Sequence, residues 1–292
     1  MAVRTLISLI ALSVAAPVMA LTPEARIAAV SYRLQTRAVE LCAERTPMAS
    51  FFIKDADSAL IDTVVPDGPA DHAGLRAGDH LAAINGTSIP AHGVSDLIDR
   101  ALDSGTLVVQ VADRGLVQLK VELGCGYSVS LDSSKAIDAY ADGTAVALST
   151  ALVDFTRDDD ELALVMAHEL SHNILRHKAQ LDAAHVKRGL FASFGKSAAA
   201  VRKTEEEADV YALYLMARAG YDINKAPTFW KRFGSKTGAG VFSDSTHLRT
   251  KARVALAEAT LLEISEKRAR CAPLAPAFTP QQIAPSQHCK KG

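Results

Sequence analysis

The residues best suited to chemistry lie in one short stretch, His168-Glu169-Leu-Ser-His172. Residues four apart share a face of an α-helix, so the two imidazoles can point at the same ion. Glu169 directly follows the first histidine, where its carboxylate can reach a water molecule held by that ion. Imidazole nitrogens suit zinc, which keeps one position open for water in catalytic sites. The pattern therefore predicts a zinc site with Glu169 as its general base.

The segment around this motif is expected to form a buried helix. Asp158 to Asp160 place negative charge at its start, which suits the positive N-terminal end of a helix, and the helix is predicted to continue to His177. The residues just before His168 are almost all apolar. Two imidazoles and a carboxylate in a buried helix are costly unless they are paired or bind a metal ion. This favours a metal site over a solvated helix face.

A third ligand is expected from the acidic run that begins at Glu205, at the start of a helix predicted over 203–219. Glu205 and Asp209 share a helical face, so Glu205 can ligate the ion while Asp209 accepts a hydrogen bond from a ligating imidazole. By local chemistry Glu206 or Glu207 would serve equally well. An acidic helix start is also a common feature that compensates the helix dipole. The spacing leaves these alternatives open.

The pattern H-E-x-x-H followed by E-x-x-x-D resembles the gluzincin family of CAAX-prenyl-protease and HtpX-like zinc metallopeptidases. The similarity covers most of 127–253, including Ala139-Tyr-Ala-Asp-Gly143. In that family the first glutamate of E-x-x-x-D is the third ligand, which implies Glu205 here and one zinc ion per chain. Ser245-Thr-His247 resembles a family motif near the metal, so His247 is a candidate for stabilising the oxyanion or for closing onto the metal.

The resemblance implies an α+β chain with a mostly helical zincin-type metallopeptidase domain over 125–270, which includes a small edge sheet. The implied reaction is hydrolysis of peptide bonds in protein or peptide substrates, in which zinc supplies an activated water molecule. The strand predicted at 144–149 is expected to be the edge strand that holds an extended substrate.

Two other functions compete with this interpretation. A peptide-binding or chaperone-like protein could hold zinc structurally, but such a protein would not need Glu169. A zinc hydrolase could also act on a substrate other than a peptide, and a substrate assay would separate the two activities.

Residues 48–124 have a different sequence pattern, with short predicted strands and glycine-rich turns. Strands are expected at 59–65, 81–84, 106–111 and 116–123, and a helix capped by Ser95 at 95–102. Asn85-Gly86 is the strongest short hairpin signal.

The stretch 65–86 closely resembles the core of PDZ domains, which bind peptides by adding a strand to a sheet edge. This implies a domain, inserted into the chain, that helps to recognise substrates, with Met48 to Phe52 as its carboxylate loop. A structural module without a ligand is the alternative.

The first twenty residues are typical of a signal peptide, with Arg4, an apolar run and small residues before a cleavage site near Ala20. We therefore expect an exported protein, periplasmic or secreted, that acts on exported or envelope proteins, with quality control as a candidate role. No later segment has the roughly 20 apolar residues that a membrane-spanning helix needs, so at most a peripheral membrane association is expected.

A helix predicted over 23–45, begun by Thr22, occupies the segment 21–47 and is expected to pack on the catalytic domain.

Four widely spaced cysteines fit an oxidising compartment, where disulfides persist. They allow three pairings. We favour Cys42 with Cys125, which flank the PDZ-like segment, and Cys271 with Cys289, which share the proline-rich tail 271–292. The formal net charge of −1 gives no positive field for phosphate backbones, so nucleic acid is not an expected partner.

Overall fold

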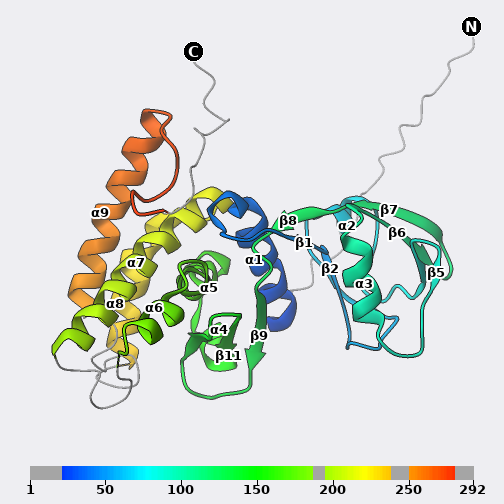
Figure 1. The fold of residues 1–292 in the computed structure, drawn as a ribbon, viewed down its shortest axis with the longest axis horizontal. Helices are drawn as coiled ribbons and strands as arrows, with labels where there is room; N and C mark the ends of the chain where they lie inside the picture. Colours follow the sequence, from blue (N-terminus) through cyan, green and yellow to red (C-terminus); the bar gives the residue numbers. More distant parts are fainter. Residues whose placement is uncertain (1–21, 187–194, 238–249, 280–292) are drawn as a thin grey trace, which may run out of the picture.

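The computed structural model describes residues 22–186, 195–237 and 250–279. A helical body and a β-rich body lie side by side, joined by two adjacent strands (Figure 1). These strands are β1 (Thr46–Met48) and β8 (Glu122–Gly124), and they pair antiparallel. None of the helices in these ranges is long and apolar enough to cross a bilayer. The expected signal peptide, 1–20, lies outside the described residues.

The β-rich body has its own core, which includes Ile61, Ile84 and Val109. Its four-stranded antiparallel sheet has the order β5-β4-β6-β7, and β2 and β3 form a separate pair. The predicted turn at Asn85-Gly86 is confirmed, because both residues have a positive φ, 46° and 79°, and join β4 to β5. The elements are β2 (Phe51–Ile53), β3 (Ile61–Val64), α2 (Pro69–His72), β4 (Leu81–Ile84), β5 (Thr87–Ser88), α3 (Val94–Leu102), β6 (Thr106–Val111) and β7 (Gly115–Lys120).

Two local predictions for the β-rich body were wrong. The predicted strand at 116–123 is divided between β7 and the linker strand β8. Helix α3 is not capped by Ser95, because the residue before the helix is Gly93, with φ at 73°. Glycine adopts this left-handed conformation at little cost. The helix has no side-chain cap, and the Gly93 backbone N–H donates to Oδ1 of Asp57 at 2.6 Å.

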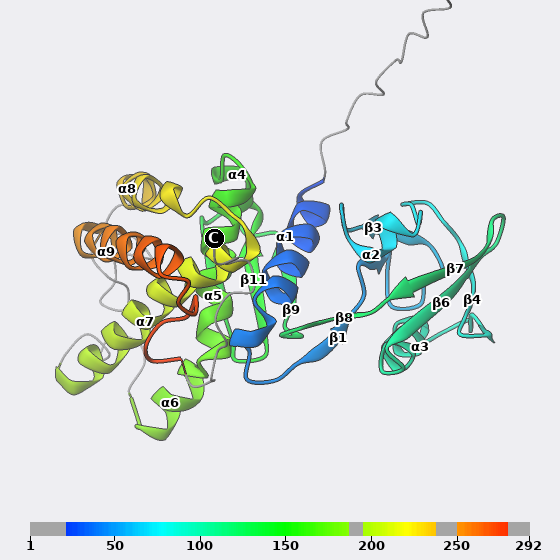
Figure 2. The same ribbon diagram turned by 90° about the horizontal axis from the view of Figure 1, so that it is seen from above.

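The N-terminal helix α1 (Pro23–Arg37) lies between the other helices and the β-rich body (Figure 2). The Thr22 hydroxyl caps it, as predicted, by accepting a hydrogen bond from the Ala25 backbone N–H. The prediction that this helix reaches Arg45 was wrong. The chain passes into the short 3-10 helix η1 (Val39–Leu41) and then extends at Cys42, which brings that residue to its disulfide partner.

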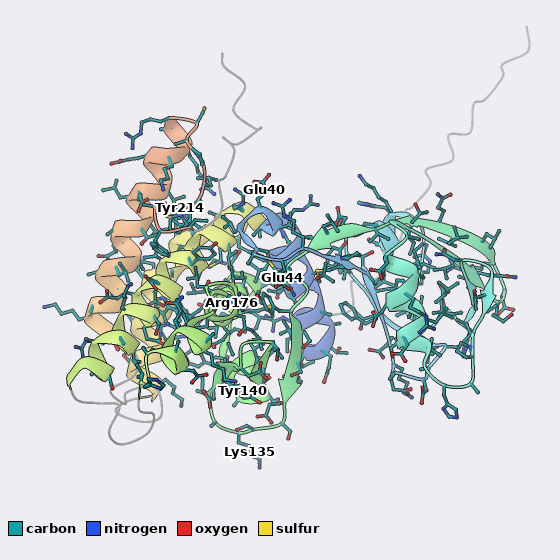
Figure 3. The ribbon with its side chains drawn as sticks, viewed as in Figure 1. Glu40, Glu44, Lys135, Tyr140, Arg176 and Tyr214 are labelled. Atoms are coloured by element: carbon teal, nitrogen blue, oxygen red, sulfur yellow. A yellow bond between two sulfur atoms is a disulfide. The ribbon has the colours of Figure 1, made fainter. Side chains whose placement is uncertain are left out.

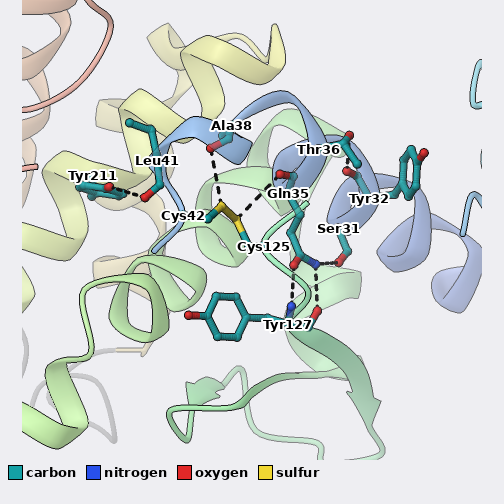
Figure 4. Close-up of a disulfide and its surroundings, with 10 residues drawn as sticks. All are labelled: Ser31, Tyr32, Gln35, Thr36, Ala38, Leu41, Cys42, Cys125, Tyr127 and Tyr211. Carbon is teal, nitrogen blue, oxygen red and sulfur yellow. Dashed lines mark hydrogen bonds between the residues drawn. A yellow bond between two sulfur atoms is a disulfide. The ribbon is translucent and has the colours of Figure 1, made fainter. Parts of the chain in front are cut away.

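The disulfide Cys42–Cys125 is confirmed, and it joins the two ends of the segment that carries the β-rich body (Figure 4). Beside it, the buried side chain of Gln35 accepts from the Tyr127 backbone N–H at 2.8 Å and donates to the Tyr127 carbonyl at 2.9 Å. Cys271 is also disulfide-bonded. Its expected partner, Cys289, lies outside the described residues.

The helical body contains a three-stranded sheet with the order β10-β11-β9. Its strands are β9 (Ser128–Asp132), β10 (Ala139–Ala141) and β11 (Ala145–Ser149). The prediction that 144–149 forms an edge strand was therefore wrong. The chain returns to pair β9 with β11 in parallel, so β11 is central and β10 is an edge. Tyr140 on β10 is 54% exposed (Figure 3).

The helices around this sheet differ from prediction mainly at their ends. Helix α5 begins at the predicted acidic run, where Asp158 caps it, but α5 stops at Ile174, and Arg176 adopts a left-handed conformation before α6 begins at His177. Helix α7 ends at Ala219, as predicted, and Gly220 after it has φ at 78°. The helices are α4 (Thr150–Phe155), α5 (Asp159–Ile174), α6 (His177–Ala183), α7 (Gly195–Ala219), η2 (Ile223–Lys225), α8 (Ala226–Thr237) and α9 (Thr250–Ala269).

Two of these helices change the interpretation of the sequence. Helix α7 begins at Gly195, so Glu205 lies well inside it and not at its start. The alternative that the acidic run merely compensates a helix dipole is therefore excluded, since that effect fades within the first turn. Helix α8 was missed by the sequence analysis. It buries Phe229, Trp230 and Phe233.

Candidate metal centre

Three predicted ligands converge where α5 and α7 pack together. Nε2 of His168 and Nε2 of His172 are 3.2 Å apart. Oε2 of Glu205 lies 3.5 Å from Nε2 of His168, and its Oε1 lies 3.4 Å from Nε2 of His172. All three residues can place a ligand atom within 4.8 Å of the others. The side chains of His168 and Glu205 are almost fully buried, and that of His172 is 16% exposed.

These distances fit a tetrahedral metal ion. Ligand atoms about 2.0 to 2.1 Å from zinc at tetrahedral angles are about 3.3 Å from one another. The separation of the two imidazole nitrogens, 3.2 Å, is close to that value, and each nitrogen faces a different oxygen of the Glu205 carboxylate, at 3.5 and 3.4 Å. Two nitrogens and one carboxylate oxygen are also the donor set of many catalytic zinc sites, which leave the fourth position to water. The residues present therefore suit a divalent ion of this kind.

The second nitrogen of His168 is held by Asp209, as predicted. Nδ1 lies 2.9 Å from Oδ1 of Asp209, so its N–H can donate to the carboxylate and leave Nε2 free for the ion. Asp209 is in turn bound by Arg253, whose Nε donates to both carboxylate oxygens at 2.8 Å. The Arg253 guanidinium is 3.4 Å from the centre of the Trp230 ring, a cation–π contact.

Sequence reasoning missed Arg253 and Trp230. Arg253 belongs to a helix start that also carries Lys251, a composition typical of an exposed turn. Only the tertiary contact with Asp209 identifies its role. The signal that could have pointed to it is the need of a buried Asp209 for a cationic partner.

These contacts set the charge of the buried cluster. Burial and the nearby Arg253 both lower the pKa of His168, but its hydrogen bonds to Asp209 and Glu205 outweigh them and raise this pKa to about 9. Burial raises the pKa of Asp209, while Arg253 and His168 more than compensate and keep it below its usual range. The carboxylates of Asp209 and Glu205 thus favour the protonated, positively charged ring of His168 when no metal ion is bound. A metal ion and a proton therefore compete for this ring.

Comparison with known proteins agrees with this geometry. Residues 111–201 match peptidase family M48, and residues 60–109 match the PDZ domain. Part of the helical body is thus similar to an M48 peptidase domain. Two curated relatives are mitochondrial metalloendopeptidases named OMA1. The protein from Schizosaccharomyces pombe is 30% identical over 138 residues, 40% of this chain and 41% of the relative. The protein from Arabidopsis thaliana is 32% identical over 141 residues, 40% of this chain and 28% of the relative. The chain thus spans less than half the length of either relative.

The remaining predicted site residues fall in three places. Glu169 is buried on α5 directly after His168, and its role as general base stays a prediction. His247 lies outside the described residues. Glu206, an open alternative for the third ligand, is exposed, and Glu207 faces His177 on α6 instead of the ligand set.

Helix α5, which carries the two histidines, is tied directly to the edge strand β10. Asn173, one residue after His172, is buried and accepts a hydrogen bond from the Gly143 backbone N–H at 2.8 Å. Its amide donates to the Ala145 carbonyl at 2.9 Å. This side chain therefore fixes the turn between β10 and β11 relative to the two histidines. Because β10 is an edge strand that packs against α5, an extended peptide could pair with it close to the metal ligands.

Proposed function

We propose that this chain is a zinc-dependent endopeptidase that hydrolyses peptide bonds of exported or envelope proteins. The observation that carries the proposal is the convergence of His168, His172 and Glu205 in a group that could hold a metal ion, with Glu169 directly after His168. The match to peptidase family M48 and the likeness to two metalloendopeptidases support the same reaction.

The chemistry divides between the ion and the side chains of the chain. A bound zinc ion would supply an activated water molecule and polarise the carbonyl of the scissile bond. Glu169 accepts the proton from that water as general base and then donates it to the leaving amine. Asp209 holds the tautomer of His168 throughout. Burial of the ligands keeps bulk water out and strengthens each of these electrostatic contacts.

The decisive experiment combines metal analysis with a protease assay. The purified protein should contain one zinc ion per chain and cleave casein, and a chelator should stop the cleavage. Glu169→Gln should keep the zinc and lose hydrolysis by at least about a hundredfold, as expected when a general base is removed. Glu206→Gln, on the exposed face of α7, is the matched control and should cleave normally.

The same experiment separates the rival functions. A chaperone-like protein with structural zinc would bind unfolded casein equally well with Gln at position 169 and would not cleave it. A zinc hydrolase with another substrate would hold zinc and leave casein and peptides intact. Absence of zinc from the purified protein, and from protein reconstituted with zinc, would contradict the proposed function itself.

We propose that the PDZ-like body recognises substrates and presents them to the M48 domain. The linker strands suggest a clean test, because Met48 pairs with Glu122 across the β1–β8 ladder. Replacing residues 49–121 with a four-residue glycine-serine turn would close this ladder as a hairpin. The variant should keep its zinc and its cleavage of small unstructured peptides but change its choice among protein substrates. Unaltered cleavage of every protein tested would rule out the recognition role.

Export of the chain is part of the same proposal. The disulfides of Cys42 with Cys125 and of Cys271 suit an oxidising compartment outside the cytoplasm. Fractionation of cells, with N-terminal sequencing of the mature protein, should find it outside the cytoplasm and starting near Leu21. A protein recovered with Met1 from the cytoplasm would contradict this part.

A further inference from the structure

A third histidine lies against the metal ligands without belonging to them. His177, the first residue of α6, is 1% exposed, and its Nδ1 is 3.0 Å from Nδ1 of His172. The two rings meet edge to face, with 4.9 Å between their centres and 80° between their planes. Because His177 faces Nδ1 of His172 and not Nε2, it stands behind the ligand and cannot bind the same ion through that nitrogen.

The protons of this pair follow from the ligand geometry. Nε2 of His172 faces Glu205 and His168, so in the metal-binding tautomer its ring proton is on Nδ1. Nδ1 of His177 must then accept that proton in a hydrogen bond. The neutral ring of His177 therefore carries its own proton on Nε2.

The buried Nε2 of His177 faces the carboxylate of Glu207. It makes no well-aligned hydrogen bond among the described residues, and Oε2 of Glu207 lies 3.3 Å away. A buried N–H without an acceptor is costly, so a small rotation of Glu207 to accept it is favourable. Glu207 comes from α7, the helix that also supplies Glu205 and Asp209.

The chain adopts an uncommon backbone conformation to bring His177 to this place. Arg176 is left-handed, with φ at 57°, which turns the chain sharply after α5. The turn is braced by Gln180, whose side chain donates to the Leu175 carbonyl at 2.6 Å. A non-glycine residue in this conformation costs about 1 kcal/mol or more and persists where the surroundings require it.

We propose that His177 and Glu207 form a positioning pair for His172, as Asp209 and Arg253 do for His168. His177 fixes the tautomer and orientation of the ligating ring, and Glu207 makes His177 a stronger acceptor. Each ligating histidine thus has its own support, one provided by a carboxylate directly and the other through a second imidazole. The inference rests on the proposed function because it requires a metal ion between His168, His172 and Glu205.

The test measures zinc affinity by competition with a chelator, together with the visible spectrum of the cobalt-substituted protein. His177→Phe removes the acceptor and should weaken zinc binding about 10- to 100-fold and shift the cobalt spectrum, as loss of an outer hydrogen-bond partner does. His177→Asn keeps an acceptor oxygen near the Nδ1 position and should restore most of the affinity. Glu207→Gln should weaken binding by about threefold or more. Glu206→Gln, the neighbouring exposed glutamate, should leave both measurements unchanged.

Zinc binding by His177→Phe within about twofold of the parent, with an unchanged cobalt spectrum, would overturn the inference. If His177→Phe does not fold, Glu207→Gln decides by the same criterion, since Glu207 is partly exposed and its other ion pair is with the exposed Lys203, one turn earlier on α7. A parent protein that binds no zinc would instead reject the proposed function, so the two failures are distinguishable.

Discussion

At the scale of single residues, the buried polar groups around His168 depend on one another. Asp209 is 6% exposed and has two partners, the His168 ring and the Arg253 guanidinium. Removing one member of such a group leaves a charge buried without compensation, which costs more than the interaction itself contributes.

Arg253→Met is therefore expected to reduce the free energy of unfolding by about 3 kcal/mol, because Asp209 loses its cation while the volume is kept. It should also weaken zinc binding, since an unpaired Asp209 no longer holds one geometry. Urea denaturation of the metal-free protein measures the first effect. Lys251→Met, an exposed residue on the same helix turn, should change stability by less than about 0.5 kcal/mol. Equal losses for both variants would contradict the role assigned to Arg253.

The spacing of residues predicted the two histidine ligands but could not by itself select the carboxylate ligand, for a physical reason. The two histidines need only a helix to bring them together, so their spacing was sufficient. Glu205 comes from another helix, and local chemistry could not choose it over Glu206 or Glu207; the family resemblance made that choice. Arg253 reaches the site through packing of α9 on α7, which no local pattern records.

At the scale of elements, the start of α5 is fastened to α8 by a bidentate ion pair. Arg232 donates to Oε1 and Oε2 of Glu161 at 2.7 and 2.6 Å, and the Arg157 backbone N–H donates to the same carboxylate. Burial alone would raise the pKa of Glu161. The bonds from Arg232 and Arg157 outweigh burial and hold this pKa below its usual range.

Because the folded pKa of Glu161 is depressed, its stabilisation is complete above the unfolded value of about 4.3 and is lost as the pH falls through the folded value. Glu161→Gln should reduce the free energy of unfolding by about 2 kcal/mol at pH 7, and the difference from the parent should shrink below about pH 4. Thermal unfolding across this range measures it. Asp159→Asn breaks only the exposed pair with Arg26 and should cost less than about 1 kcal/mol. A pH-independent loss for Glu161→Gln would contradict the ion-pair explanation.

The turn between α5 and α6 gives a prediction of the opposite sign. Arg176 is exposed, and its side chain sits on a backbone with φ at 57°. Arg176→Gly relieves the left-handed strain and should stabilise the protein by up to about 1 kcal/mol, although glycine gains entropy in the unfolded chain. Lys178→Gly, two residues later inside α6, should destabilise by about 0.5 to 1 kcal/mol. Differential scanning calorimetry distinguishes the two signs.

The types of the main elements were predictable from the sequence, with α8 as an exception, but their ends and their neighbours were not. The apolar run of α5 predicted a buried helix, yet the residue type at His177 does not indicate that the helix ends and the chain turns before it. Strand β11 was predicted as a strand, but it is buried along almost its whole length, and its central place depends on β9 pairing with it across the sheet. Pairing between segments far apart in the chain is a tertiary outcome that local patterns do not contain.

At the scale of the whole molecule, the β-rich body is attached through a short, cross-linked connection. The β1–β8 ladder and the disulfide Cys42–Cys125 hold the two linkers together at the surface of the helical body. Gln35 fixes the same place from α1 by bonding both backbone groups of Tyr127 (Figure 4). The insert can therefore fold on its own core while its two ends stay anchored beside the helical body.

This connection predicts how the disulfide contributes to stability. The two cysteines are 83 positions apart, and a loop of that length corresponds to a chain-entropy contribution of about 4 to 5 kcal/mol. Replacing residues 49–121 with a four-residue turn shortens the loop to about 15 residues, for which the same relation gives about 3 kcal/mol. Removing both cysteines, as Cys42→Ala with Cys125→Ala, should thus cost about 1 to 2 kcal/mol more in the full chain than in the shortened one. Urea unfolding of the four proteins, monitored by far-UV circular dichroism, measures the difference. Equal losses in the two backgrounds would show that the disulfide acts through its native contacts beside Gln35 and not through the freedom of the unfolded insert.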